Sequence, residues 1–151
     1  MKIFLNVDEL LFDMRNKSHQ ETADITDVEE RYRVEAGEHK VDELRRGISE
    51  VASILTRTVS RYLVDYYHQY ADNDSCLPET LVYEFELSER RMINKAQPLS
   101  DAMHSFIVHY VLAKYYATVN RTELSNKHSQ LTQEAALLID EILYTKRPPI
   151  V

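Results

Sequence analysis

Apolar residues occupy nearly every side of the helix predicted over residues 99–116, LSDAMHSFIVHYVLAKYY. A surface helix of a small domain carries one apolar stripe, whereas a helix that is apolar all round is buried among its neighbours. The segment therefore predicts a buried central helix, which Pro98 and the region of Asn120 delimit. Four of its residues are expected in the core: Phe106, Ile107, Tyr110 and Val111.

Two further segments carry a single apolar stripe, which is typical of helices that cover a core. One long helix is predicted over residues 41–70, and it is expected to place Val51 and Leu55 against the central helix. Gly47 in this helix indicates close packing against another backbone or a functional bend. The last helix is predicted over residues 122–145, with a stripe of five residues: Leu124, Leu131, Ala135, Leu138 and Ile142. The last two are expected to face the central helix.

The beginning of the chain combines a short extended segment, residues 1–5, with a helix predicted to run from Asn6 to about Lys17. Asparagine is a favoured N-cap residue, and Asp8 and Glu9 suit the positive end of the helix dipole.

Residues 80–87, TLVYEFEL, alternate apolar with mostly polar side chains, and this period of two predicts a strand. An isolated strand would leave both edges unpaired. Its partner is therefore expected from residues 1–5, from residues 31–36, or from a neighbouring subunit.

Residues 18–40 are polar, acidic and poorly periodic, and they are interpreted as a long loop or arm. Within them, RYRVEA at 31–36 alternates enough to form a strand if it finds a partner edge. A connection of this length is usually functional or disordered. The tail at 148–151 is expected to be extended, because prolines end the last helix.

Composition favours helices in one domain over residues 1–151. With 44% hydrophobic residues, a chain of 151 residues can bury about 70% of the surface that its unfolded form exposes. Only two glycines occur, and neither GxGxxG nor GxxxxGK[ST] is present, which disfavours nucleotide-binding α/β folds. We expect a mainly α fold, a bundle of about four helices around a buried central helix, with a small β element and the polar arm.

Charge and cysteine content limit the partners and the compartment. The net charge of −7 disfavours general adhesion to nucleic acid or to an anionic membrane, because both require a cationic surface. Charged residues interrupt the apolar segment 99–116, and no secretory signal is recognised, so no membrane association is expected. A single cysteine, Cys76, favours a reducing compartment.

No motif in the sequence announces a reaction. A di-metal helical bundle requires two Glu-x-x-His pairs, and none is present. The only plausible nucleus of ionisable residues comprises two Asp-x-x-His pairs and one further histidine: Asp65, His68, Asp101, His104 and His109. Such pairs are more often local hydrogen bonds than ligand sets. We therefore expect no enzyme activity, no metal and no cofactor.

Tyrosines are concentrated in residues 62–70 and 110–116. Tyrosine is favoured where one end of the side chain is buried and the other is wet, as at the margin of a core or at a subunit interface. Few basic residues lie between these rings, so stacking on single-stranded nucleic acid is not indicated.

Four segments, in this order, with the polar excursion after the first and the strand after the second, resemble small virion proteins of tailed bacteriophages and prophages, the head–tail connector or adaptor class. The segments are MKIFLNVDELLFDM, HKVDELRRGISEVASILTRTVSRYL, SDAMHSFIVHYVLAKYY and AALLIDEILYTKRPP. The resemblance implies a helical subunit with a β excursion and an extended tail, and a ring of subunits below the portal.

The same resemblance implies portal and tail or connector proteins as partners, DNA that passes through the lumen without specific binding, and a virion location after synthesis in the bacterial host cytoplasm. An arm and an unpaired strand can be completed by a neighbour through strand addition. Assembly contacts are therefore expected from eight residues: Arg31, Tyr32, Arg33, Val34, Tyr66, Tyr70, Tyr83 and Phe85.

Three other functions fit parts of the pattern. They are another assembly role in a virion or prophage, a regulatory helical bundle that binds a host or phage protein, and an enzyme built on the five ionisable residues named above. A regulatory bundle is expected to be a monomer or dimer, whereas a connector forms a larger ring. The oligomeric state therefore separates these hypotheses.

Overall fold

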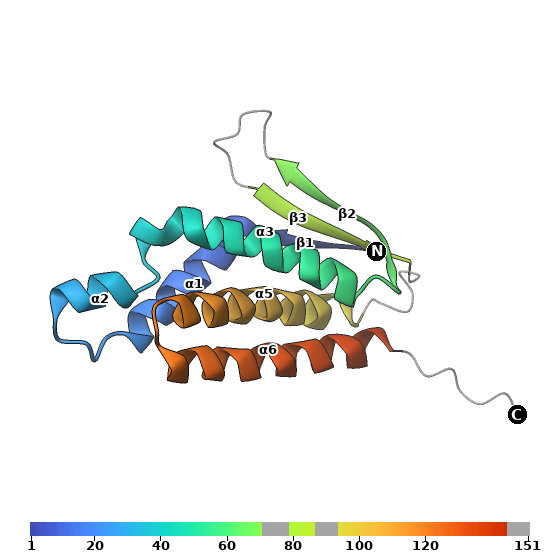
Figure 1. The fold of residues 1–151 in the computed structure, drawn as a ribbon. Coiled ribbons are helices and arrows are strands. Elements are labelled where there is room, and N and C mark those ends of the chain that lie inside the picture. Colours follow the sequence, from blue (N-terminus) through green and yellow to red (C-terminus); the bar gives the residue numbers. More distant parts are fainter. Residues whose placement is uncertain (71–78, 87–93, 145–151) are drawn as a thin grey trace, which may run out of the picture.

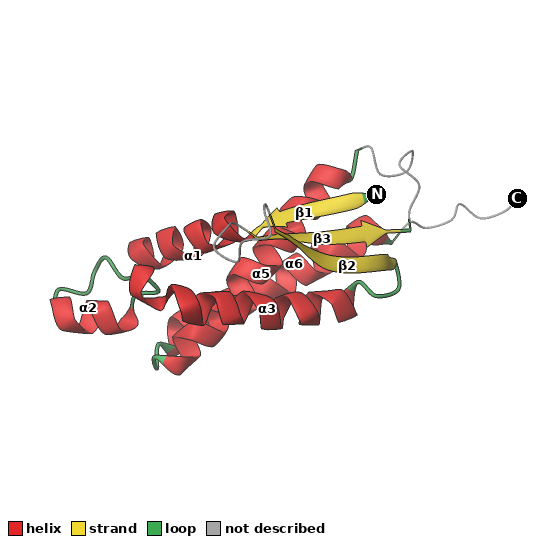
Figure 2. Cartoon of the chain, turned by 90° about the horizontal axis from the view of Figure 1, so that it is seen from above, coloured by secondary structure: helices red, strands yellow, loops and turns green. Residues whose placement is uncertain are grey.

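A three-stranded antiparallel sheet lies against one side of a layer of helices (Figures 1 and 2). The computed structural model describes residues 1–70, 79–86 and 94–144. The elements in chain order are β1 (Lys2–Asn6), α1 (Val7–Glu21), α2 (Val28–Val34), the 3-10 helix η1 (Glu38–Lys40), α3 (Val41–Thr58), β2 (Leu63–Tyr70), β3 (Glu79–Phe85), α5 (Ala96–Thr118) and α6 (Thr122–Leu143). The predicted mainly helical class with a small β element is confirmed, and α1, α3, α5 and α6 are the four long helices of the described residues.

Strand β3 lies in the middle of the sheet, and β1 and β2 pair antiparallel with its two sides. The strand predicted at 80–87 corresponds to β3, and the N-terminal segment is one of its predicted partners. Ile3 and Leu5 of β1 are buried, whereas Lys2 and Phe4 are exposed. One face of the sheet therefore packs on the helices, and the other face points away from them.

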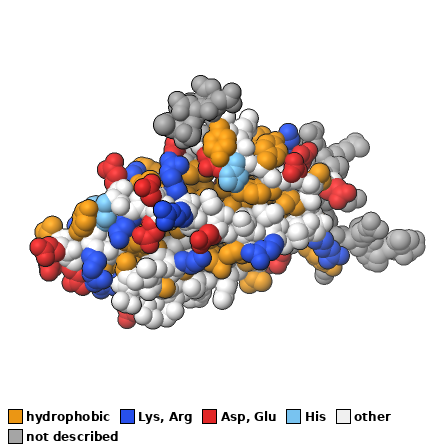
Figure 3. Space-filling model, turned by 45° about the horizontal axis from the view of Figure 1, so that its top comes forward, with side chains coloured by type: hydrophobic (Ala, Val, Ile, Leu, Met, Phe, Trp, Pro, Cys, Tyr) orange, Lys and Arg blue, Asp and Glu red, His pale blue; other side chains and the backbone are white. Residues whose placement is uncertain are grey.

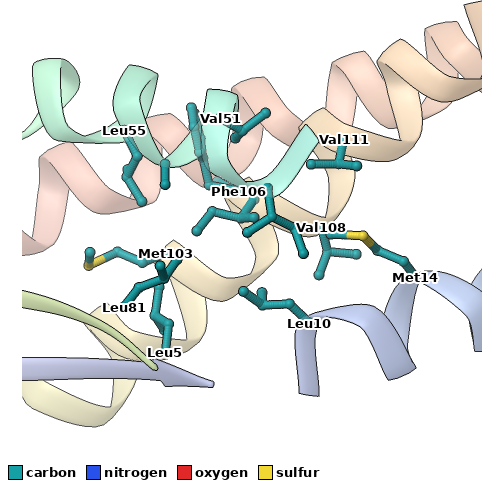
Figure 4. Packing of buried hydrophobic residues seen from close by; sticks show 14 of the residues in the cluster. Leu5, Leu10, Met14, Val51, Leu55, Leu81, Met103, Phe106, Val108 and Val111 are labelled. Carbon is teal, nitrogen blue, oxygen red and sulfur yellow. The ribbon is translucent and has the colours of Figure 1, made fainter. Parts of the chain in front are cut away.

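Helix α5 carries eleven buried residues and contacts α1, α3, α6 and β1. In Figure 4, Leu10 and Met14 of α1 approach Val108, and Val51 of α3 lies close to Phe106. Three of the four residues expected in the core of this helix are buried, and the fourth is half-buried: Phe106, Ile107 and Val111, with Tyr110.

Helices α3 and α5 approach each other closely at Gly47. A Cβ atom at this position would lie 3.0 Å from Cγ1 of Val111, which is closer than side chains normally pack. Close packing, one of the two interpretations offered by the sequence, therefore explains this glycine.

The buried stripe of α6 differs from the predicted one. Leu138 is 46% exposed, and Leu124, Leu131 and Ile142 are only partly buried. The helix instead buries His128, Thr132, Ala135, Ile139 and Leu143. The two stripes share Ala135 and differ by a rotation about the helix axis. Two polar residues belong to the observed stripe because their side chains find hydrogen-bond partners inside the protein.

The long helix predicted over residues 41–70 is wrong in its second part. Helix α3 ends at Thr58, and residues 63–70 form β2. The spacing of Tyr62 and Tyr66 continues the helical period, which explains the error. Aromatic and β-branched residues also favour strands, however, and seven positions of β2 pair with β3.

Residues 18–40 contain helices instead of the predicted loop, and the strand predicted at 31–36 is not formed. Helix α1 extends to Glu21, beyond its predicted end. Helix α2 begins after Asp27, whose carboxylate accepts a hydrogen bond from the Glu29 N–H at 3.0 Å. Local capping thus stabilises a short helix where alternation suggested a strand.

The chain returns to the core after α2. Val34 and Ala36 are fully buried. The Ala36 N–H donates to Oγ of Ser18 at 2.8 Å, and the Tyr115 hydroxyl donates to the Glu35 carbonyl at 3.0 Å. This part of the segment therefore belongs to the subunit itself.

Two predicted helix boundaries are confirmed. Asn6 caps α1, because its Oδ1 accepts a hydrogen bond from the Glu9 N–H at 3.2 Å. Asn120, with φ of 62°, separates α5 from α6. The predicted extended tail at 148–151 and Cys76 lie outside the described residues.

Candidate assembly interface

Three of the eight predicted interface residues lie in the core. Val34 and Tyr83 have no exposed surface, and Phe85 is 2% exposed. The Tyr83 hydroxyl donates to the Ala52 carbonyl of α3 at 3.2 Å, and burial raises the pKa of this hydroxyl well above its usual value. These three side chains cannot contact a neighbour in the folded subunit, so the prediction is wrong for them. Their apolar character serves the core.

The predicted interface residues of α2 lie at one end of the molecule, beyond α3 and away from the sheet (Figure 1). Tyr32 is 62% exposed and stacks on His39, with ring centroids 3.9 Å apart. Arg33 is exposed beside it, whereas Arg31 is half-buried and lies 3.9 Å from the Glu35 carboxylate.

The predicted interface residues of β2 lie on the sheet. Tyr66 is half-buried, with its ring centroid 4.7 Å from that of Tyr83, and its hydroxyl lies at hydrogen-bond distance, 2.7 Å, from Nε2 of His68. Burial raises the pKa of Tyr66 to about 12. Tyr70, at the end of β2, is 54% exposed. Figure 1 shows β2 and α2 in separate parts of the molecule, so the eight predicted residues do not form one surface.

Both outer strands of the sheet, β1 and β2, have one side without a strand partner among the described residues. Free N–H and C=O groups on such an edge can pair with a strand of another chain. Large side chains on these strands are exposed: Phe4 (53%), Val64 (58%) and Tyr70 (54%). Figure 3 shows hydrophobic side chains gathered in the upper part of the view, where the sheet lies. We take the two sheet edges as the candidate assembly interface.

The face of the sheet that points away from the helices carries three cross-strand rows, each running from β1 through β3 to β2. The rows are Lys2, Glu84 and Asp65; Phe4, Val82 and Tyr67; and Asn6, Thr80 and Gln69. The charged row ends in a cation on β1 and an anion on β2, and the middle row ends in an aromatic ring on each edge. The pKa of Lys2 is raised, chiefly by the Tyr67 hydroxyl and then by the Glu84 and Asp65 carboxylates.

A buried polar cluster joins the helices on the other side of the molecule. His128 is 1% exposed, and its Nε2 lies 2.8 Å from both carboxylate oxygens of Glu21. Lys127 donates to the same carboxylate at 2.9 Å, and the Tyr116 hydroxyl does so at 3.3 Å. Burial would raise the pKa of Glu21, but the bonds from His128 and Lys127 hold it below its ordinary value. The cluster thus links α1, α5 and α6.

The cluster continues to His109, whose Nδ1 lies 2.9 Å from Nδ1 of His128. Only one hydrogen fits between these two nitrogens, so both imidazoles cannot be charged without breaking this contact. Burial first, and then the proximity of His128, lowers the pKa of His109 to about 4. His109 is therefore neutral near pH 7 and keeps the contact intact.

The five ionisable residues considered as an enzyme nucleus have separate partners. His104 Nε2 lies 2.6 Å from the Asp13 carboxylate, His68 pairs with Glu79, and Asp101 accepts a hydrogen bond from Gln97. No group of three or more histidine, cysteine, aspartate or glutamate side chains in the described ranges is arranged to hold a metal ion.

A surface hollow of about 470 Å³ lies between α5 and α6. Its apolar lining comprises Pro98, Ala102, Leu131, Ala135 and Leu138. His109, Asp101 and Glu134 add polar groups to the lining. This hollow is a second surface on which a partner could bind.

Sequence reasoning found the exposed Tyr70 but missed the open edges, because β2 was expected to be helical. A signal for the β1 edge was available, since Lys2 and Phe4 alternate with Ile3 and Leu5.

Comparison of the chain with protein-family models, with curated proteins and with solved structures finds no match. None of the helices in the described part of the chain is long and apolar enough to cross a membrane.

Proposed function

We propose that this protein is a non-enzymatic virion structural subunit of the head–tail connector or adaptor type, which assembles into a ring below the portal. The observation that carries the proposal is the pair of sheet edges that no other described strand covers, with Phe4 exposed on one and Val64 and Tyr70 on the other. Edges of this kind promote association between chains unless something covers them.

A ring requires two different patches on each subunit, because each subunit contacts one neighbour on either side. The edges of β1 and β2 are two such patches on opposite sides of one sheet. A self-complementary dimer needs only one patch, and the second edge would then remain open.

In this proposal α5 is the central helix of the subunit, and helix α2, within the predicted arm of residues 18–40, is the part that projects from it. Tyr32 and Arg33 on α2 are exposed at the far end of the molecule and are available to the portal or to a tail protein. The net charge of −7 favours passage of DNA through the lumen without specific binding. The protein is then made in the bacterial host cytoplasm and resides in the virion.

The hollow between α5 and α6 favours a second candidate function, that of a regulatory bundle. Leu138 is 46% exposed at this hollow, and a partner helix could cover it. Such a protein would bind its partner as a monomer or dimer.

The test is the mass of the purified protein by light scattering over a hundredfold range of concentration, alone and with the portal protein of the same genome. We expect concentration-dependent oligomers larger than a dimer, stabilised by portal. A monomer or dimer that neither grows with concentration nor binds portal would contradict the connector proposal and favour the regulatory bundle.

A further inference from the structure

We propose that neighbouring copies of this chain join their sheets edge to edge, with β2 of one subunit pairing in parallel with β1 of the next. This inference rests on the proposed ring and specifies the contact that builds it. The occupant of each edge is therefore a second copy of this chain.

Strand direction fixes the parallel pairing. Both β1 and β2 run antiparallel to β3, so the two outer strands of one subunit point in the same direction. In a ring of many subunits, each copy is rotated only slightly relative to the next. The β1 strand of the neighbour therefore reaches β2 in the same direction as β2.

The charged row supports this contact through complementarity. Lys2 is exposed on β1, where its ammonium lies 5.9 Å from the centroid of its own Tyr67 ring, and Asp65 is exposed at the β2 edge. Within one subunit, Glu84 of β3 stands between them. Edge-to-edge addition in the same register places Lys2 of one copy directly beside Asp65 of the next, and opposite charges on neighbouring strands stabilise a sheet.

The aromatic row supports the same register. Phe4 lies at the β1 edge and Tyr67 at the β2 edge, with the fully buried Val82 between them. The addition brings Phe4 of one copy against Tyr67 of the next, and such aromatic pairs stabilise sheets. The third row places Asn6 beside Gln69, which are both polar.

The lengths of the two strands also agree. Strand β1 has five residues, and the regular part of β2 that lies in register with them runs from Asp65 to Gln69. The irregularity between Leu63 and Asp65 falls outside this stretch. The shared ladder would be about 16 Å long at ~3.3 Å per residue.

Pairing of two β2 strands about a two-fold axis is the competing arrangement. Centred on Tyr67, it would place Tyr67 against its own copy and Asp65 against Gln69. It offers Asp65 no cation and leaves the β1 edge of both copies open. The observed charges thus favour the pairing of β2 with β1 of the next copy.

Disulfide trapping distinguishes the two arrangements. Phe4 and Tyr67 of one subunit are separated by β3, about 9.6 Å at the spacing of two strands, which is too far for a disulfide within the chain. The variant F4C/Y67C is made in a C76S background and lacks both aromatic rings of the contact. It is therefore oxidised at a protein concentration well above that at which the unmodified protein assembles, and it is analysed on a denaturing gel. We expect a ladder of covalent oligomers beyond the dimer, and monomers from F4C alone and Y67C alone.

Charge exchange provides an independent readout. Lys2→Glu and Asp65→Lys should each reduce the assembled fraction at least tenfold, and the double variant should restore it. The exposed residues Arg57 and Glu123 lie on α3 and α6 and belong to no strand, so Arg57→Glu and Glu123→Lys are matched controls that should assemble normally. Circular dichroism verifies that every variant is folded.

Two results would overturn the proposed contact. Covalent dimers from Y67C alone would identify the two-fold arrangement. Rings that form in the unmodified protein, together with F4C/Y67C that gives no ladder and charge variants that assemble normally, would show that the ring uses another surface. In that second case the proposed function stands. A protein that forms no oligomer alone or with portal contradicts both.

Discussion

The helical side and the sheet side of this protein differ in how completely their apolar side chains are buried and their polar groups are hydrogen-bonded within the subunit. On the helical side, α5 is buried among α1, α3 and α6, and even the imidazole of His128 has partners on both nitrogens. On the sheet side, β1 and β2 each present an unpaired edge within the described residues, with Phe4, Val64 and Tyr70 exposed. The first arrangement stabilises one subunit, whereas the second leaves groups available for another chain. Substitutions on the helical side should therefore lower the free energy of unfolding, whereas substitutions on the sheet side should reduce assembly.

The largest effect is expected from Phe106→Ala in α5. Phe106 is 4% exposed and packs in the core with Val51. Its truncation should lower the free energy of unfolding by about 3–5 kcal/mol, because a cavity adds to the lost burial. Chemical denaturation measures this change. Leu137→Ala, at a position of α6 that is 64% exposed, is the control and should change stability by less than about 1 kcal/mol. A loss near 1 kcal/mol for Phe106→Ala would mean that this helix does not organise the core.

The second effect concerns the polar cluster on the helical side. Glu21→Ala leaves the buried Nε2–H of His128 without its acceptor, and it should lower the free energy of unfolding by about 1–3 kcal/mol. Glu30→Ala is the control, because Glu30 forms an exposed ion pair with Arg121 and should contribute less than about 1 kcal/mol. Equal losses for the two variants would contradict a structural role of the cluster.

The difference between the two sides also explains what the sequence could predict. Helices α1, α5 and α6 follow from local periodicity and capping, and their predicted ranges lie close to the observed ones. Strand β2 was missed because Tyr62 and Tyr66 fit a helical period, while its pairing with β3 depends on residues distant in the chain. The short helix α2 was missed because its cap at Asp27 lies in an acidic segment without apolar periodicity.

The candidate interface was predicted only in part for the same reason. Tyr70 was recognised and is exposed, but Tyr83 and Phe85 were assigned to a surface although they are buried. An alternating strand does not reveal which face meets a helix, because that choice depends on tertiary packing. Lys2 and Asp65 belong to one charged row only because β1 and β2 both pair with β3, and these pairings join residues that are distant in the chain.

The third effect is a loss of stability of the helical side in acid. The pKa of His109 is about 4 in the folded protein and about 6.5 in the unfolded chain, so the unfolded state binds more protons between these values. Stability from this group is complete above pH 6.5 and falls as the pH decreases to 4. Because His109 is only half-buried, solvent screening reduces the effect to about 1–2 kcal/mol.

Denaturation at several pH values tests this expectation. The groups that face His109 are His128, Lys17, Glu21 and Lys127, and protonation of Glu21 adds to the loss only at lower pH. His109→Asn keeps an amide donor toward His128 but does not titrate, so its stability should change less between pH 6.5 and 4. An unchanged pH dependence in this variant would assign the acid sensitivity to another group.

The smallest effect on stability is expected on the sheet side, where the effect on assembly should be largest. Phe4→Thr removes an exposed ring but keeps a residue that favours strands, so the free energy of unfolding should change by less than about 1 kcal/mol. The assembled fraction should nevertheless fall at least tenfold, because in the proposed contact the aromatic ring of Phe4 meets Tyr67 of the next copy. Phe12→Thr is the matched control, since Phe12 is 60% exposed on α1 and lies outside the sheet. Light scattering measures assembly, and denaturation of the same samples measures stability. If both variants assembled equally, the exposed ring on β1 would have no role between subunits, and the contrast between a completed helical side and an incomplete sheet side would not extend to function.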